Sequence, residues 1–164
     1  NGFGTPGLVT AIPGRESLPL FSFRGWQAGV NLSSTALEED CETKSSVAPM
    51  IVQCESKVFD LSGARAGSIV QIYNGKLSAL RIISSSDYAE FILDAFKVKY
   101  GKPCKSDIEV WQNGFGGKFD NPVFTWCFRT GNLIFSSIGR QKDNIEINYN
   151  DVNEPKVNSP TINF

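Results

Sequence analysis

The chain has no histidine among its 164 residues. Histidine is the usual base beside a catalytic serine or cysteine and the commonest metal ligand. Its absence excludes Ser-His-Asp and Cys-His catalytic units and His-ligated metal sites. The remaining serine chemistry, a Ser-Lys dyad, needs a Ser-x-x-Lys motif at a helix start, and none stands there. We therefore expect no catalytic, cofactor-binding or metal-binding residues.

The chain also lacks a strong charge of either sign and a long apolar run. The formal net charge of −1 gives no long-range attraction for phosphates, so nucleic acid is not an expected partner. No apolar stretch approaches the roughly 20 residues of a membrane span, so no transmembrane segment is expected. The sequence starts at Asn1 rather than at methionine and shows no basic stretch followed by an apolar one, as expected of a mature secreted chain or of a trimmed one. A lipid anchor upstream of Asn1 stays open.

Four cysteines are present, at Cys41, Cys54, Cys104 and Cys127. An even set in a small chain is typical of disulfides made in an oxidising compartment, so we expect a periplasmic or secreted protein. Of the three possible pairings we favour the sequential one, because each bridge would join a helix end to the following strand. The alternative is reduced, buried cysteines in a cytoplasmic protein. Zinc is disfavoured because no Cys-x-x-Cys motif occurs.

The residue pattern divides the chain into an irregular Gly- and Pro-rich arm (1–20), one domain (21–150) and a tail (151–164). Asn74-Gly75 between two apolar runs predicts a β-hairpin, because a type I′ turn needs positive φ at both central residues. Further apolar runs predict strands over residues 50–54, 108–111, 123–128, 133–138 and 145–149.

Two helices are expected. Ser85-Ser86-Asp87 offers a cap before apolar residues at helical spacing, and Gly101 ends the pattern. A shorter helix is expected over 35–42. The predicted fold is α+β: one antiparallel sheet with a short and a long helix packed on one face, and two disulfides. Because the order helix, cysteine, strand, cysteine occurs twice, a degenerate tandem repeat is also indicated.

The cysteine placement carries a resemblance to a known family. The segments concerned are Gly29–Ser34, Leu37, Asp40–Thr43 and Cys54, and then Phe96 through Cys104 to Cys127–Phe128. Each set resembles one half of the β-lactamase-inhibitor-protein-like (BLIP-like) fold, and similar modules occur in small bacterial envelope lipoproteins. The resemblance implies a secreted tandem α+β protein with one disulfide per half and an inhibitor-like role.

The most informative candidate site is the Gly-rich loop over residues 113–120. Three glycines permit tight turns, and Phe115, Lys118 and Phe119 are candidate partner-binding residues, because an exposed loop aromatic can anchor another protein. The alternative is a long hairpin loop whose phenylalanines fold back onto the core. The glycine spacing does not fit a phosphate-binding loop.

Charged side chains give weaker candidates. Asp107 and Glu109 lie two apart on an expected strand, as a carboxylate-dependent hydrolase would need, but Trp111 and Trp126 are expected in the core rather than in a sugar site. The acidic residues of 38–42 are interpreted as a solvated helix face. The lysines between 97 and 105 are attributed to the C-terminal end of the long helix.

These observations favour a non-catalytic extracytoplasmic binding protein of the inhibitor or immunity type, which recognises another protein without a cofactor. Two alternatives stay open. One is a structural, lipoprotein-like envelope module. The other, less favoured, is a hydrolase that works through carboxylates alone.

Overall fold

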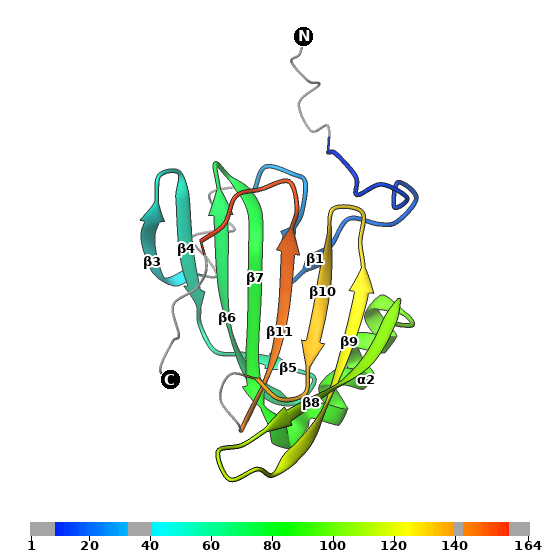
Figure 1. Cartoon of the computed structure of the whole chain (residues 1–164). Helices are drawn as coiled ribbons and strands as arrows, with labels where there is room; N and C mark the ends of the chain where they lie inside the picture. Colours follow the sequence, from blue (N-terminus) through cyan, green and yellow to red (C-terminus); the bar gives the residue numbers. More distant parts are fainter. Residues whose placement is uncertain (1–8, 33–40, 140–142, 158–164) are drawn as a thin grey trace.

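The computed structural model describes residues 9–32, 41–139 and 143–157 (Figure 1). Within them, an antiparallel sheet of nine strands has the order β3-β4-β6-β7-β11-β10-β9-β8, with β5 paired to β6 beside this path. Its strands are β3 (Cys41–Ala48), β4 (Ile51–Ser56), β5 (Phe59–Leu61), β6 (Ala64–Tyr73), β7 (Lys76–Ser85), β8 (Lys105–Gln112), β9 (Lys118–Cys127), β10 (Gly131–Ser136) and β11 (Asn144–Asp151). A separate small hairpin joins β1 (Ser22–Phe23) to β2 (Trp26–Gln27).

The strand order divides the sheet into two halves that lie side by side, each a run of four neighbouring strands. β3, β4, β6 and β7 follow one another across one half of the sheet, and β8, β9, β10 and β11 follow one another inward from the other edge. The halves meet where β7 pairs with β11, from Ala79 opposite Asn150 to Ser85 opposite Asn144. The main chain passes from one half to the other through the helix.

Two disulfides join sequential cysteines. Cys41 is bonded to Cys54, with Cα atoms 5.4 Å apart, and Cys104 to Cys127, with Cα atoms 5.9 Å apart. The first bridge links β3 to β4, and the second links the residue before β8 to the end of β9. Each bridge therefore fastens an outermost strand of the sheet to its neighbour. Two disulfides fit a protein that resides outside the cytoplasm.

The hairpin expected at Asn74-Gly75 is confirmed. Tyr73 pairs with Lys76, and the two residues between them have φ values of 47° and 82°. Asparagine and glycine are the residues that tolerate this left-handed backbone best, so the local sequence dictates the turn between β6 and β7.

The long helix is also confirmed, as a segment formed by η1 (Ser86–Tyr88) and α2 (Ala89–Tyr100). The Ser85 hydroxyl accepts a hydrogen bond from the Asp87 N–H, and Gly101 ends the segment with a φ of 84°. Its buried residues are Ile92 and Phe96, whereas Phe91, one of the apolar residues that predict the helix, is 67% exposed. The apolar face is thus rotated away from Phe91.

The expected antiparallel sheet with two disulfides is confirmed, but the described residues do not form a clear α+β fold with two helices. They form a β-rich molecule with a single helical segment. The short helix was expected over 35–42; residues 33–40 lie outside the described ranges, and Cys41 and Glu42 begin β3. Cys41 pairs with Ser56 and is bridged to Cys54, and Glu42 lies at the register shift before the next pair, so the ladder with β4 takes the place of a helix end here. Within the described ranges, no helix reaches the length and apolarity of a membrane span.

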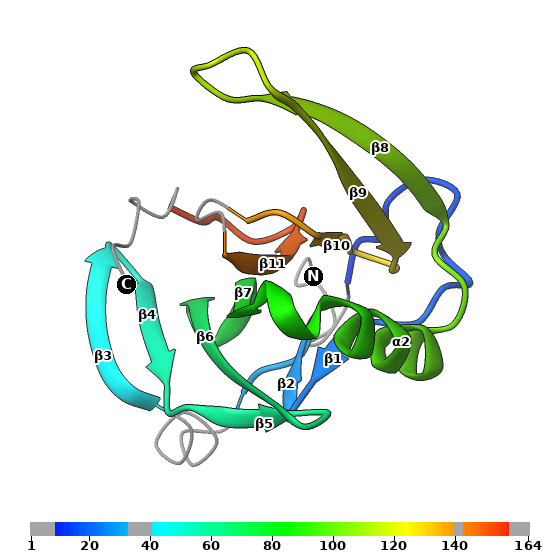
Figure 2. The ribbon, with the colours of Figure 1, turned by 90° about the horizontal axis from the view of Figure 1, so that it is seen from below.

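One face of the sheet carries the core. Figure 2 shows α2 and the β1–β2 hairpin on this side of the sheet. Aromatic rings dominate it: Phe21 stacks on Tyr149 with centroids 4.1 Å apart, and Phe96 lies 6.0 Å from Trp126. Residues 9–20, the described part of the expected arm, contain no helix or strand, and the Ile12 N–H donates to the Arg129 carbonyl.

Candidate functional site

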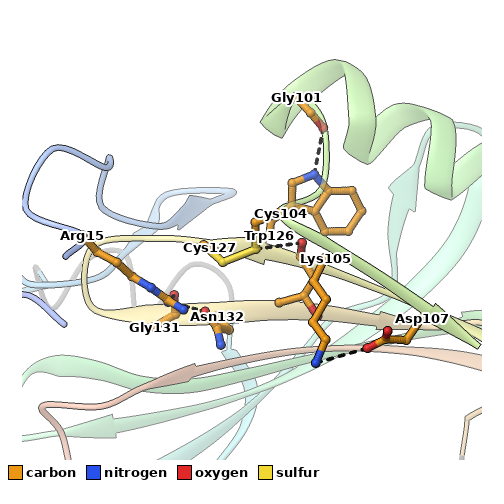
Figure 3. Close-up of a disulfide and its surroundings, with 10 residues drawn as sticks. Arg15, Gly101, Cys104, Lys105, Asp107, Trp126, Cys127, Gly131 and Asn132 are labelled. Carbon is orange, nitrogen blue, oxygen red and sulfur yellow. Dashed lines mark hydrogen bonds and ion pairs between the residues drawn. A yellow bond between two sulfur atoms is a disulfide. The ribbon is translucent and has the colours of Figure 1, made fainter. Parts of the chain in front are cut away.

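The hairpin formed by β8 and β9 is the candidate site, and its base is firmly anchored. Besides the Cys104–Cys127 bridge, the buried Trp126 donates its indole N–H to the Gly101 carbonyl at 2.8 Å, at the end of α2 (Figure 3). The Lys97 ammonium lies 5.3 Å from the centre of the Phe124 ring, between helix and β9. A disulfide, a hydrogen bond and a cation–π contact therefore fix where the hairpin leaves the body of the protein.

Beyond this base the hairpin is strongly exposed. All eight residues of β8 are exposed, and among the described strands β8 lies at the edge of the sheet and pairs with β9 alone. Ile108 and Val110 are 65% and 64% exposed. Both side chains lie on the sheet face that carries the core. Ser106 projects from the same face of β8, and its cross-strand partner is Phe124, which is half-buried against the core. The core face therefore continues onto β8, where no other described residue covers Ile108 and Val110.

The tip of the hairpin is an ordered turn. The Asn113 side-chain oxygen accepts hydrogen bonds from the N–H groups of Phe115 and Gly117, at 2.9 and 2.8 Å. Gly116 has a φ of 85°, which favours glycine. Held between these contacts, Phe115 is 100% exposed. The alternative that this phenylalanine folds back onto the core is wrong.

The structure separates the three predicted partner-binding residues. Lys118 and Phe119 belong to β9 rather than to the loop and, as consecutive strand residues, project from opposite faces. Phe119 pairs with Trp111 across the hairpin, and both rings are exposed. The expectation that Trp111 belongs to the core is therefore wrong, whereas Trp126 is buried there as expected. The exposure of Ile108, Val110 and Trp111 was not predicted from the sequence.

Asp107 and Glu109 share the face of β8 that carries Trp111, as predicted from their spacing. Asp107 lies 3.2 Å from the Lys105 ammonium in an exposed ion pair, and Glu109 accepts a hydrogen bond from the Trp111 indole at 3.3 Å. Neither carboxylate lines the cavities beside Glu55, Gln71 or Phe124. The acidic residues 38–40 lie outside the described ranges, and Glu42 is exposed on β3. Of the lysines, Lys99 lies 5.2 Å from the Phe23 ring centre at the helix end.

Two cavities border the sheet face opposite the core. The larger, of about 600 Å³, lies between the ends of β4, β6 and β7 and includes Glu55, Arg65 and Asn144 in its wall. The second, of about 320 Å³, is bordered by the C-terminal segment: the Gln71 side-chain amide donates to the Val157 carbonyl and its oxygen accepts from the Val157 N–H. A third, of about 360 Å³, lies between the end of α2 and Phe124. Among the described residues, no cluster of His, Cys, Asp or Glu could hold a metal ion.

A buried polar group lies at the end of β11. The Thr130 and Tyr149 hydroxyls both donate to one Asp151 carboxylate oxygen, at 2.9 and 3.0 Å, and the Asn153 N–H donates to the other at 2.8 Å. Burial, together with the charge of Asp151, raises the pKa of Tyr149 well above its ordinary value. These groups are enclosed and satisfied, so they support the fold rather than form a reactive site.

Comparisons of the chain with family models, with curated proteins and with solved structures yield no match.

Proposed function

We propose that this chain is a non-catalytic binding protein of the inhibitor or immunity type, periplasmic or secreted, that recognises another protein through the β8–β9 hairpin. The observation that carries the proposal is Phe115, fully exposed at the tip of an ordered turn. Burying a phenylalanine at an interface contributes roughly 1.5–3 kcal/mol. Because the hydrogen bond from its N–H to Asn113 orders the backbone of the turn before binding, little backbone conformational entropy is lost when a partner covers Phe115.

The anchored base supports the same proposal. A hairpin that binds a partner must keep its orientation in the complex. The disulfide joins the base of β8 to β9, and the Trp126 hydrogen bond joins β9 to the end of the helix. Phe119 and Trp111 add an exposed aromatic pair on one face of the hairpin. Exposed aromatic rings around an anchor are the usual composition of a protein–protein contact.

The BLIP-like resemblance also agrees with the proposal. It implies two tandem halves with one disulfide each, and the two runs of four strands, each with a disulfide in its outer hairpin, support a degenerate repeat. The hydrolase alternative has less support, because Asp107 and Glu109 lie on an exposed strand and engage Lys105 and Trp111.

The test is affinity capture from periplasmic and secreted extracts with the purified chain as bait, followed by affinity measurement on the captured protein. We expect Phe115→Ser to weaken binding by about thirtyfold, as for an interface anchor worth about 2 kcal/mol, and Phe119→Ser to weaken it as well. Phe91→Ser is the matched control, since Phe91 is also exposed but lies on α2. A captured protein that binds the Phe115→Ser and Phe119→Ser variants as tightly as it binds the unaltered chain contradicts the proposal.

A further inference from the structure

We infer that the free edge of β8 binds a partner strand in which basic side chains alternate with apolar ones, extending the sheet by one strand. This inference rests on the proposed function and specifies how the hairpin holds its partner. Strand addition supplies main-chain hydrogen bonds along an edge, and side chains at alternate positions supply the specificity.

The two edges of the sheet differ in a way that singles out β8. The ladder between β3 and β4 has two register shifts, and β3 presents polar side chains such as Lys44 to solvent. Bulges and charges of this kind are how proteins prevent unwanted pairing at an edge. The ladder between β8 and β9 has eight consecutive pairs without a shift, and β8 exposes Ile108 and Val110. β8 is thus a regular edge with apolar side chains.

The edge is accessible along its length. Figure 2 shows β8 as an outermost strand that leaves the end of α2 and extends toward the tip of the hairpin. All of its residues are exposed, so an incoming strand would displace solvent rather than protein. Pairing with β9 along all eight residues keeps β8 extended before binding, which lowers the entropic cost of adding a strand.

The two faces of β8 determine the chemistry of the partner. Asp107 and Glu109 lie on one face with one cation, Lys105, so this face of the strand has a net charge of −1. The exposed Lys105–Asp107 pair is worth at most about 1 kcal/mol, so a partner's cation can replace it. Side chains opposite Asp107 and Glu109 should therefore be lysine or arginine. Those between them face Ile108 and Val110 and should be apolar.

A second copy of β8 does not meet this requirement. The antiparallel register that places Ile108 opposite Ile108 also places Asp107 opposite Glu109. The register that places Ile108 opposite Val110 places Glu109 opposite Glu109. Like charges directly opposite each other destabilise a sheet. A third register places Val110 opposite Val110 without opposed carboxylates, but it leaves Ile108 of both copies opposite Gln112. No antiparallel register of two copies therefore pairs both Ile108 and Val110 with apolar side chains without repulsion, and the charge pattern favours a basic strand from another protein.

The experiment uses the full chain and two short blocked peptides as probes, one alternating lysine with valine and the other glutamate with valine. Residue-resolved amide hydrogen exchange is measured with each. We expect the lysine–valine peptide to slow exchange of alternate β8 amides, those not paired with β9, by about tenfold at saturation. The amides of β3 should not change. We expect the glutamate–valine peptide to have no effect.

Charge reversal supplies the decisive variant. Asp107→Lys together with Glu109→Lys should reverse the preference, so that β8 is protected by the glutamate–valine peptide. Both residues are exposed, and unchanged thermal unfolding of the variant would show that it is folded. Glu42→Lys with Glu90→Lys is the matched control, because it changes net charge equally at exposed positions outside the hairpin and should keep the original preference.

Four outcomes overturn the inference: no protection of β8 by either peptide, equal protection by both, protection at β3 instead, or dimerisation through β8 without peptide. The capture experiment tests a different part of the hairpin. A captured protein that depends on Phe115 but binds the charge-reversed variant equally well would overturn strand addition and sustain the proposed function. The lysine–valine peptide could protect β8 while the Phe115 and Phe119 variants still capture the partner normally. That result would overturn the contact at the tip of the hairpin and sustain strand addition at the edge of β8.

Discussion

At the scale of single residues, Tyr149 is the side chain whose ionisation bears most directly on stability. It is buried, stacks on Phe21 and donates its hydroxyl to the Asp151 carboxylate. Its raised pKa means that the folded state prefers the neutral phenol more than the unfolded state does. The resulting stability is fully present below the unfolded pKa of about 10 and is lost as pH rises above it toward the folded pKa.

We therefore expect Tyr149→Phe to lower the free energy of unfolding at neutral pH by about 1–3 kcal/mol, because Asp151 loses one buried donor. The same change should make the loss of stability above about pH 10 less steep. Denaturant unfolding at a series of pH values measures both effects. Tyr88→Phe is the control, since Tyr88 is exposed, and it should change neither. An unchanged alkaline slope in the Tyr149 variant would show that another group controls it.

Individual residues also show why the site was only partly predictable. Glycine and asparagine identified the turn at 113–117, because such turns need these residue types whatever surrounds them. Ile108, Val110 and Trp111 could not be placed by the same reasoning. An apolar run indicates that a strand can be buried, but whether a layer covers it depends on where α2 ends in space, and α2 leaves β8 uncovered.

At the scale of elements, those with strong local signals were predictable and those held by long-range pairing were not. The Asn74-Gly75 turn and the capped helix follow from residues next to each other in the chain. β3 has six exposed residues in its middle and no alternation of apolar and polar side chains, so no pattern distinguishes it from a loop or a helix end. Its extended conformation comes from β4 and from the Cys41–Cys54 bridge.

The two disulfides should contribute similarly to global stability but differently to local structure. Replacing either pair by alanine should cost about 3 kcal/mol by loop-closure entropy, since the bridged residues are 13 and 23 apart. Loss of Cys104–Cys127 should also speed hydrogen exchange in β8 and β9 and weaken capture, because the base of the hairpin then keeps its noncovalent contacts, such as the Trp126 hydrogen bond and the Lys97–Phe124 contact, but no covalent link. Loss of Cys41–Cys54 should speed exchange in β3 and β4 instead.

Urea unfolding and residue-resolved exchange of the two double variants measure these effects. Unaltered exchange in β8 and β9 without the Cys104–Cys127 bridge would show that the bridge does not hold the hairpin. Equal loss of capture in both variants would attribute the effect to global destabilisation rather than to the hairpin base.

At the scale of the whole molecule, the pairing of β7 with β11 unites the two halves of the sheet. Ile82 lies opposite Ile147 at this seam, and both are fully buried in one hydrophobic cluster that draws residues from both halves. On the opposite face, the largely buried Arg81 and Glu146 form an ion pair at 3.2 Å across the same strands. Because both faces of the seam are held, the halves should unfold together.

We therefore expect Ile82→Ala and Ile147→Ala each to lower the free energy of unfolding by about 2–5 kcal/mol while keeping a single transition. Hydrogen exchange should accelerate at Val70 in one half and at Leu133 in the other, since both are buried in the shared core. Ile108→Ala removes the same atoms from an exposed position and should change stability by less than about 0.5 kcal/mol. Two separate unfolding transitions, or faster exchange confined to one half, would mean that each half folds on its own core.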